Sequence, residues 1–246
     1  MPWLLIDNSN TRTKFALGDA EFLLSWRGVI PTADLTAETL GGLLRGVSFD
    51  AVVICSVVPD KAAELAGFFE GRQPVHFVNS TSPLGMGIDY PVPSQIGADR
   101  LANAAGVLHR HPVPAIIIDF GTAVTFDVIS AEPAYCGGAI APGLGAMSGY
   151  LTRKTALLPE IDLIEPASAI GKSTTHAMQV GAVFGYRGLV REIILRIRKE
   201  LDGRPTIIAT GGDAALIARG LEEIDVVDPD ITLEGLRRVA ARVFPA

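Results

Sequence analysis

The sequence predicts an α/β protein made of two related halves. Short apolar runs bounded by turn residues alternate with longer helical patterns, which is typical of strands and helices that pack in layers. The segments LLIDNSNTRTKFAL, beginning at Leu4, and IIIDFGTAVTFDVI, beginning at Ile116, place Asp7 and Asp119 at equivalent positions. With 246 residues, 48% of them hydrophobic, the chain can bury one large core or two smaller ones.

The expected elements follow a similar order in both halves. In the first half, apolar runs between turn residues predict strands over residues 3–6, 14–17, 23–27, 51–55 and 75–78. In the second half, they predict strands over residues 115–118, 124–129, 135–140, 206–209 and 226–227. Helices are expected around 174–201 and 232–243, and the run RLANAAGVLHR after Asp99 also has a helical pattern.

Charge and composition favour a small-molecule ligand. The net charge is −6 and the basic residues are scattered, which argues against a nucleic-acid partner. The first apolar run is interrupted at Asp7, and no uncharged stretch approaches the roughly 18 residues of a membrane span. We therefore expect a soluble, cytoplasmic protein without a membrane partner. Cys55 and Cys136 lack the spacing of zinc ligands or a disulfide framework, and both are expected to be buried thiols.

The two aspartates of the repeat carry the first chemical indication. Asp7 and Asp119 each follow an apolar strand, where an ionised carboxylate is costly unless it meets a cation or hydrogen-bond donors. The small residues after each aspartate leave backbone N–H groups available to phosphate oxygens. Two such hairpins predict a site for a polyphosphate and its metal, although either aspartate alone is also explained as the cap of a turn.

Two familiar nucleotide motifs do not fit this chain. Asp119-Phe120-Gly121 matches the magnesium-binding triplet of protein kinases, but the glycine-rich loop and the HRD segment that must precede it are absent. The run around Lys172 resembles the end of a Walker A loop, but Pro166 stands where that loop requires glycine. Ser173 or Thr174 is instead expected to cap the helix that follows.

Several short motifs together resemble the type III pantothenate kinases. They occur in the same order along nearly the whole chain: residues 7–14, GADR at 97–100, DFGTAVT at 119–125, GGAIAPG at 137–143, GKST at 171–174 and ATGG at 209–212. The resemblance implies the fold of the acetate and sugar kinase, actin and heat-shock chaperone ATPase superfamily. It consists of two ribonuclease-H-like domains, expected here at 1–112 and 113–246, with the nucleotide in the cleft between them.

The resemblance also implies the reaction and its residues. The reaction is the ATP-dependent phosphorylation of pantothenate to 4'-phosphopantothenate, the first step of coenzyme A biosynthesis, with Asp99 as catalytic base. Pantothenate is expected at Tyr90, Gly97, Ala98, Arg100 and Thr174. ATP is expected at Asp7, Asn8, Ser9, Asn10, Thr11, Arg12, Thr13, Lys14, Thr122, Gly211 and Gly212. Magnesium accompanies ATP, Asp119 is expected beside a monovalent cation (K⁺ or NH₄⁺), and the family implies a homodimer.

Several of these residues have structural alternatives that the sequence leaves open. Asp99 is also explained by the preference of helix N-termini for an anion, and Arg100 by a surface ion pair. Tyr90 is also explained as a packed loop aromatic, and Gly211 with Gly212 as a strand-to-helix turn. A non-catalytic relative on the same fold, or a phosphotransferase with another small substrate, is the alternative function.

One position departs from the family pattern. The first phosphate turn of the family usually reads Asp-x-Gly-Asn-Thr, whereas this chain has Ser9 in the glycine place. If the turn required a positive φ, the serine would cost about 1–2 kcal/mol of local strain. Alternatively, the serine hydroxyl donates a hydrogen bond to a phosphate oxygen or to the turn itself.

Overall fold

The computed structural model describes residues 2–244, which fall into two compact units. The first unit takes in the chain up to His111, the short segment Pro133–Tyr135 and the chain from Asp230 onward. The second unit consists of Pro112–Glu132 and Cys136–Pro229. The domain limits expected from the sequence, 1–112 and 113–246, stay a prediction.

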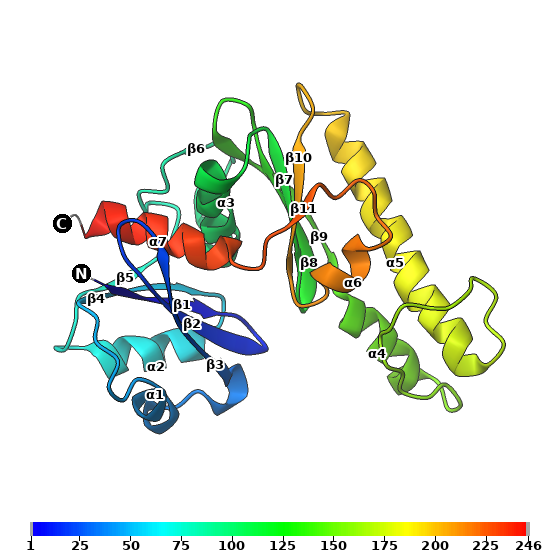
Figure 1. Ribbon diagram of the computed structural model, residues 1–246, viewed down its shortest axis with the longest axis horizontal. Coiled ribbons are helices and arrows are strands. Elements are labelled where there is room, and N and C mark those ends of the chain that lie inside the picture. Colours follow the sequence, from blue (N-terminus) through cyan, green and yellow to red (C-terminus); the bar gives the residue numbers. More distant parts are fainter. Residues whose placement is uncertain (1, 245–246) are drawn as a thin grey trace. The chain divides into compact units, whose positions relative to one another are not determined.

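The first unit is a mixed five-stranded sheet covered by helices on both faces (Figure 1). Its strands are β1 (Trp3–Asn8), β2 (Arg12–Gly18), β3 (Leu23–Pro31), β4 (Ala51–Ser56) and β5 (Val75–Phe77), in the order β3-β2-β1-β4-β5. Its helices are η1 (Thr32–Asp34), α1 (Ala37–Leu43), α2 (Pro59–Phe69), η2 (Pro93–Gln95), α3 (Ala98–Arg110) and α7 (Ile231–Val243). The two-residue strand β6 (Gly87–Ile88) pairs with Ala134 and Tyr135.

The second unit contains a sheet with the same connectivity. Its elements are β7 (Ala115–Phe120), β8 (Ala123–Ile129), β9 (Ala134–Pro142, whose first two residues belong to the first unit), α4 (Leu144–Lys154), α5 (Thr174–Arg198), β10 (Thr206–Gly211), α6 (Ala214–Ala218) and β11 (Val226–Val227). The strand order β9-β8-β7-β10-β11 repeats the order β3-β2-β1-β4-β5 of the first sheet. In both sheets the first strand runs antiparallel to the second and parallel to the fourth. The repeat predicted from the sequence is therefore confirmed.

Without a gap, the two repeated segments align Thr13 with Thr125, and this pairing is wrong by one position. Asp7 lies opposite Lys14 across the first hairpin, whereas Asp119 lies opposite Thr125 across the second. The first turn is one residue longer, and a shift of one residue moves a side chain to the other face of a strand. Thr125 is thus the counterpart of Lys14.

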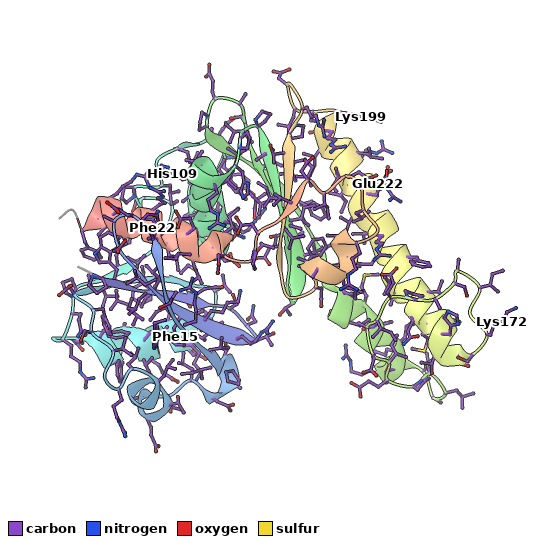
Figure 2. The ribbon with its side chains drawn as sticks, viewed as in Figure 1. Phe15, Phe22, His109, Lys172, Lys199 and Glu222 are labelled. Carbon is purple, nitrogen blue, oxygen red and sulfur yellow. The ribbon has the colours of Figure 1, made fainter. Side chains whose placement is uncertain are left out.

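Alternation along the strands builds the core of each unit. Leu4, Ile6 and Phe15 point to one face of the first sheet, where they pack with Val52 and Ile54 under α1 and α2 (Phe15 is labelled in Figure 2). On the other face, α7 contacts β1 and β4 and packs against α3. In the second unit, Ile116, Ile118 and Phe120 pack against Val183, Tyr186 and Val190 of the long helix α5.

The predicted strands and helices are confirmed, with ends that shift by a few residues, and the helical run after Asp99 forms α3. The short helices α1, α2, α4 and α6 were not recognised in the sequence. Cys55 is buried as expected, whereas Cys136 is only partly buried, so that prediction is wrong. Among residues 2–244, none of the helices has both the length and the apolar character needed to cross a membrane.

Candidate active site

Asp7 lies near the end of β1 and is almost completely buried, with an exposed fraction of 3%. The register of the hairpin places Lys14 directly opposite, and its Nζ lies 3.4 Å from Asp7 Oδ2. The hydroxyl of Ser9 donates to Asp7 Oδ1 at 2.9 Å, and the thiol of Cys55 lies 3.7 Å from the same oxygen. This carboxylate therefore meets a cation and donors, as the sequence predicted for a charged group at the end of a buried strand.

In the described chain, only glycines have a positive φ, so the φ of Ser9 is negative. The strain considered from the sequence is therefore absent. The hydroxyl of Ser9 instead supports the turn through Asp7, which agrees with the second alternative.

Beneath the same turn, a chain of polar side chains connects the strands β1, β2 and β4 with η1. Ser56 donates to Asn8 at 2.6 Å, and Asn8 donates to Thr13 at 2.8 Å. The hydroxyls of Thr13 and Thr32 lie 3.1 Å apart, and Thr32 donates to the carbonyl of Ser9 at 2.6 Å. Buried polar groups must find such partners, so this chain fixes the shape of the turn.

Asp99 is the second residue of α3 and does not precede the helix as the sequence suggested. Its Oδ1 accepts the backbone N–H of Arg100 at 2.8 Å. A Cβ at Gly97 would lie 2.6 Å from the same oxygen, so a side chain there would force the carboxylate to move.

The carboxylates of Asp7 and Asp99 both act on Cys55. Burial raises the pKa of the Cys55 thiol well above its usual value, and the negative charges of Asp7 and Asp99 raise it further. The first turn and the start of α3 thus both place a negative charge close enough to influence this thiol. The charge of Lys14 acts on this thiol in the opposite direction.

Arg100 and Tyr90, two residues expected to bind pantothenate, meet at Tyr135. The guanidinium carbon of Arg100 lies 5.7 Å from the Tyr135 ring centroid, and the Tyr90 ring packs edge-on against Tyr135 at 6.2 Å. Tyr135 is fully buried and was missed in the sequence, because only the pairing of β6 with β9 brings it close. Packing and ligand binding are compatible roles for Tyr90 and Arg100.

A pocket of about 530 Å³ borders Gly97 and Ala98 at the start of α3. The rest of its lining is uncharged and comes from the segments that follow β4 and β5 and from η2: Ser56, Val57, Val78, Asn79, Ser80, Ser94, Gln95 and Ile96. Ligands of open α/β sheets bind outside the carboxyl ends of the strands, where this pocket lies.

In the second unit, Asp119 and the expected nucleotide residues gather at the ends of β7 and β10. Gly211 has φ +92°, and a Cβ there would lie 2.6 Å from Asp119 Oδ1. Thr122 is exposed in the turn after β7, and its carbonyl accepts the N–H of Gly143 at 3.1 Å. Gly212 is exposed directly after β10.

Thr174 is the first residue of α5, and its side chain is exposed. The cap of this helix is Ser173, whose hydroxyl accepts the N–H of His176 at 3.1 Å. Of the two candidates from the sequence, Ser173 is thus the cap. Thr174 lies in the second unit, whereas Tyr90, Gly97 and Arg100 lie in the first.

Comparison with known proteins identifies relatives over almost the whole chain. The family model described as type III pantothenate kinase matches residues 3–196. A type III pantothenate kinase of Akkermansia muciniphila is 59% identical over 98% of each chain. One of Methylacidiphilum infernorum is 42% identical over 96% of this chain and 87% of its own.

Solved structures with low sequence identity share the fold. A structure described as a Baf family transcriptional activator from Campylobacter jejuni has a TM-score of 0.64 at 16% identity, over 98% of each chain. The activator of 2-hydroxyisocaproyl-CoA dehydratase from Clostridium difficile, with bound ADPNP, has a TM-score of 0.56 at 14% identity. It covers 99% of this chain and 94% of its own. The two-sheet fold is that of the actin-like ATPase superfamily.

Proposed function

Because this chain belongs to the type III pantothenate kinase family, we propose that it transfers the γ-phosphoryl group of ATP to pantothenate, with Asp99 as the base. The observation that carries this proposal is the position of Asp99. Its carboxylate lies in the first turn of α3, beside Gly97. Its negative charge acts on the Cys55 thiol together with the charge of Asp7. The product is 4'-phosphopantothenate, as in coenzyme A biosynthesis.

Asp99 accepts the proton of the acceptor hydroxyl. Phosphoryl transfer has a loose transition state, so alignment and charge neutralisation matter more than early proton abstraction. A carboxylate held by the N–H of Arg100 and the N-terminus of α3 is a weak base, which suffices when the proton leaves late. One position along, Arg100 presents a guanidinium suited to the carboxylate of pantothenate.

ATP phosphates bind at the first turn, where backbone N–H groups and the neighbouring Lys14 of β2 offer donors to phosphate oxygens. The nucleotide contacts expected from Thr122, Gly211 and Gly212 of the second unit stay predictions. The nucleotide cleft between domains, the pantothenate contacts of Thr174 and a cytoplasmic location stay predictions.

The cations in this proposal are hard, and the residues offer oxygen ligands. Asp119 supplies a carboxylate beside Gly211 for a monovalent cation, K⁺ or NH₄⁺. Magnesium travels with ATP and keeps several of its waters, so it needs few protein ligands. Among the described residues, no three His, Cys, Asp or Glu side chains gather as a metal cage.

The direct test is ADP release from ATP and magnesium, with and without pantothenate. We expect ADP to appear only with pantothenate, together with a phosphorylated product in the mass spectrum. Replacing sodium by potassium at constant ionic strength should raise the rate if Asp119 holds the cation. Absence of pantothenate-dependent turnover in either salt contradicts the proposed acceptor, and equal rates in both salts contradict the cation site.

We also propose that two copies of the chain associate through the second unit. Met147, Tyr150 and Leu151 are exposed and lie three and four residues apart, so they form one apolar face of α4. On α5, Gly181 and Gly185 are exposed with open space around them, which allows close approach of another backbone. Figure 1 shows α4 beside the first half of α5.

A further inference from the structure

Thr32 holds the first phosphate turn from a distant part of the chain. It directly follows β3 as the first residue of η1, and it is 3% exposed. Its backbone N–H donates to the carbonyl of Thr11 at 3.0 Å, and its hydroxyl donates to the carbonyl of Ser9 at 2.6 Å. This one buried residue therefore forms hydrogen bonds to the residues on both sides of Asn10.

The direction of the hydrogen bonds around Thr32 follows from the number of protons. A threonine hydroxyl has one proton, and that of Thr32 is directed to the Ser9 carbonyl. Thr13 must then donate to Thr32 across the 3.1 Å between their hydroxyls. Thr13 in turn accepts from the amide of Asn8, whose own oxygen accepts from Ser56. The chain ends at the Ser9 carbonyl, and each of the three hydroxyl protons in it is donated once.

This fixes the orientation of the peptide that joins Ser9 to Asn10. The peptide is trans, because the cis bond in the described chain is at Val113-Pro114. In a trans peptide, the C=O and the N–H point in opposite directions. With the Ser9 carbonyl held against Thr32, the N–H of Asn10 points away from Thr32, on the side where Asn10 and Thr11 are exposed.

We infer that Thr32 is a positioning residue for ATP, which orients the Asn10 N–H toward a phosphate oxygen of the nucleotide. Backbone N–H groups that are fixed in advance bind anions without paying for reorganisation of the loop. Thr32 itself does not contact the nucleotide. The inference rests on one part of the proposed function, the binding of ATP at this turn, and does not depend on the identity of the phosphate acceptor.

The test replaces Thr32 by valine, which keeps the shape and removes the hydroxyl, and by serine, which keeps the hydroxyl. Dissociation constants of ATP and of adenosine are measured by NMR titration, and the Michaelis constants of both substrates by ADP release. We expect T32V to weaken ATP binding about two- to tenfold, the effect of one hydrogen bond. Adenosine binding and the Michaelis constant of pantothenate should stay unchanged, and T32S should be close to the wild type.

T232V is the matched control for loss of a buried threonine hydroxyl. Thr232 is 5% exposed and donates to Asn103 at 2.7 Å, in the same unit but away from the turn. It should lower the unfolding temperature as T32V does, without weakening ATP binding. Should T32V not give a folded protein, T32A compared with T32S carries the same test.

Three results would overturn the inference. They are unchanged ATP binding in T32V, equal weakening of ATP and adenosine binding, and equal weakening of ATP binding in T232V. A wild type without pantothenate-dependent turnover would refute the proposed acceptor. The comparison of ATP with adenosine would still decide the role of Thr32.

Discussion

At the scale of single residues, Asp99 combines a structural and a chemical position. Its Oδ1 accepts the N–H of Arg100, a contact that an asparagine oxygen can also make. We therefore expect D99N to fold normally and to lose about 10²- to 10⁴-fold in turnover, the range for removal of a general base. ADP release and thermal unfolding check both parts. Turnover like that of the wild type would leave Asp99 with only a helix N-terminal role.

Ser9 provides a second prediction at this scale, and the structure gives its sign. Because Ser9 has no positive φ and its hydroxyl donates to Asp7, glycine there removes a hydrogen bond and relieves no strain. We expect S9G to raise the Michaelis constant of ATP about two- to tenfold, with little change for pantothenate.

S9A separates the hydroxyl from the backbone, because alanine lacks the hydroxyl but restricts the chain as serine does. S9A should share the loss if the hydroxyl matters. A change confined to pantothenate would show that this turn does not face the nucleotide.

At the scale of elements, Gly211 is the last residue of β10, where it pairs with Phe120 at the end of β7. Its φ is +92°, and a Cβ added there would lie only 2.6 Å from Asp119 Oδ1, so the site leaves no room for a side chain. We expect G211A to destabilise the protein by about 1–3 kcal/mol and to weaken ATP binding, as measured by chemical unfolding and by titration.

G67A is the matched control for the Gly211 substitution. Gly67 lies within α2 and has open space around it. Alanine there should stabilise the helix by about 0.5–1 kcal/mol. If both variants had the same free energy of unfolding, the close approach of β10 to Asp119 would not contribute to the stability of the protein.

The elements also show what could be predicted from the sequence and what could not. The strands around Asp7 and Asp119 follow from short apolar runs and the turn residues after them, so both hairpins were predictable. Thr32 and Tyr135 reach their sites through contacts distant in sequence, which leave no local pattern. The extra residue in the first hairpin turn was also not predicted. An alignment based on identical residues contains no information about which residues pair across the two strands.

At the scale of the whole molecule, sequence order and compact units do not coincide. Helix α7 ends the chain, yet it packs against β1, β4 and α3 of the first unit. The contact is close enough that a side chain at Gly106 or Gly235 would collide with the backbone of the other helix. Loss of α7 would expose the face of α3 that it covers, and α3 carries Asp99 in its first turn. The sequence around Asp99 contains no sign of this dependence.

The assembly of two chains gives the last prediction. The exposed apolar face of α4 contains Tyr150, 57% exposed, with Met147 and Leu151 beside it. If a second copy covers this face, sedimentation should give twice the chain mass of 26.0 kDa, and Y150E should give the mass of a single chain, because a carboxylate buried without a partner is costly. F22E is the matched control, since Phe22, labelled in Figure 2, is 66% exposed in the first unit. F22E should sediment as the wild type does; dissociation in F22E, or none in Y150E, would place the contact elsewhere on the surface.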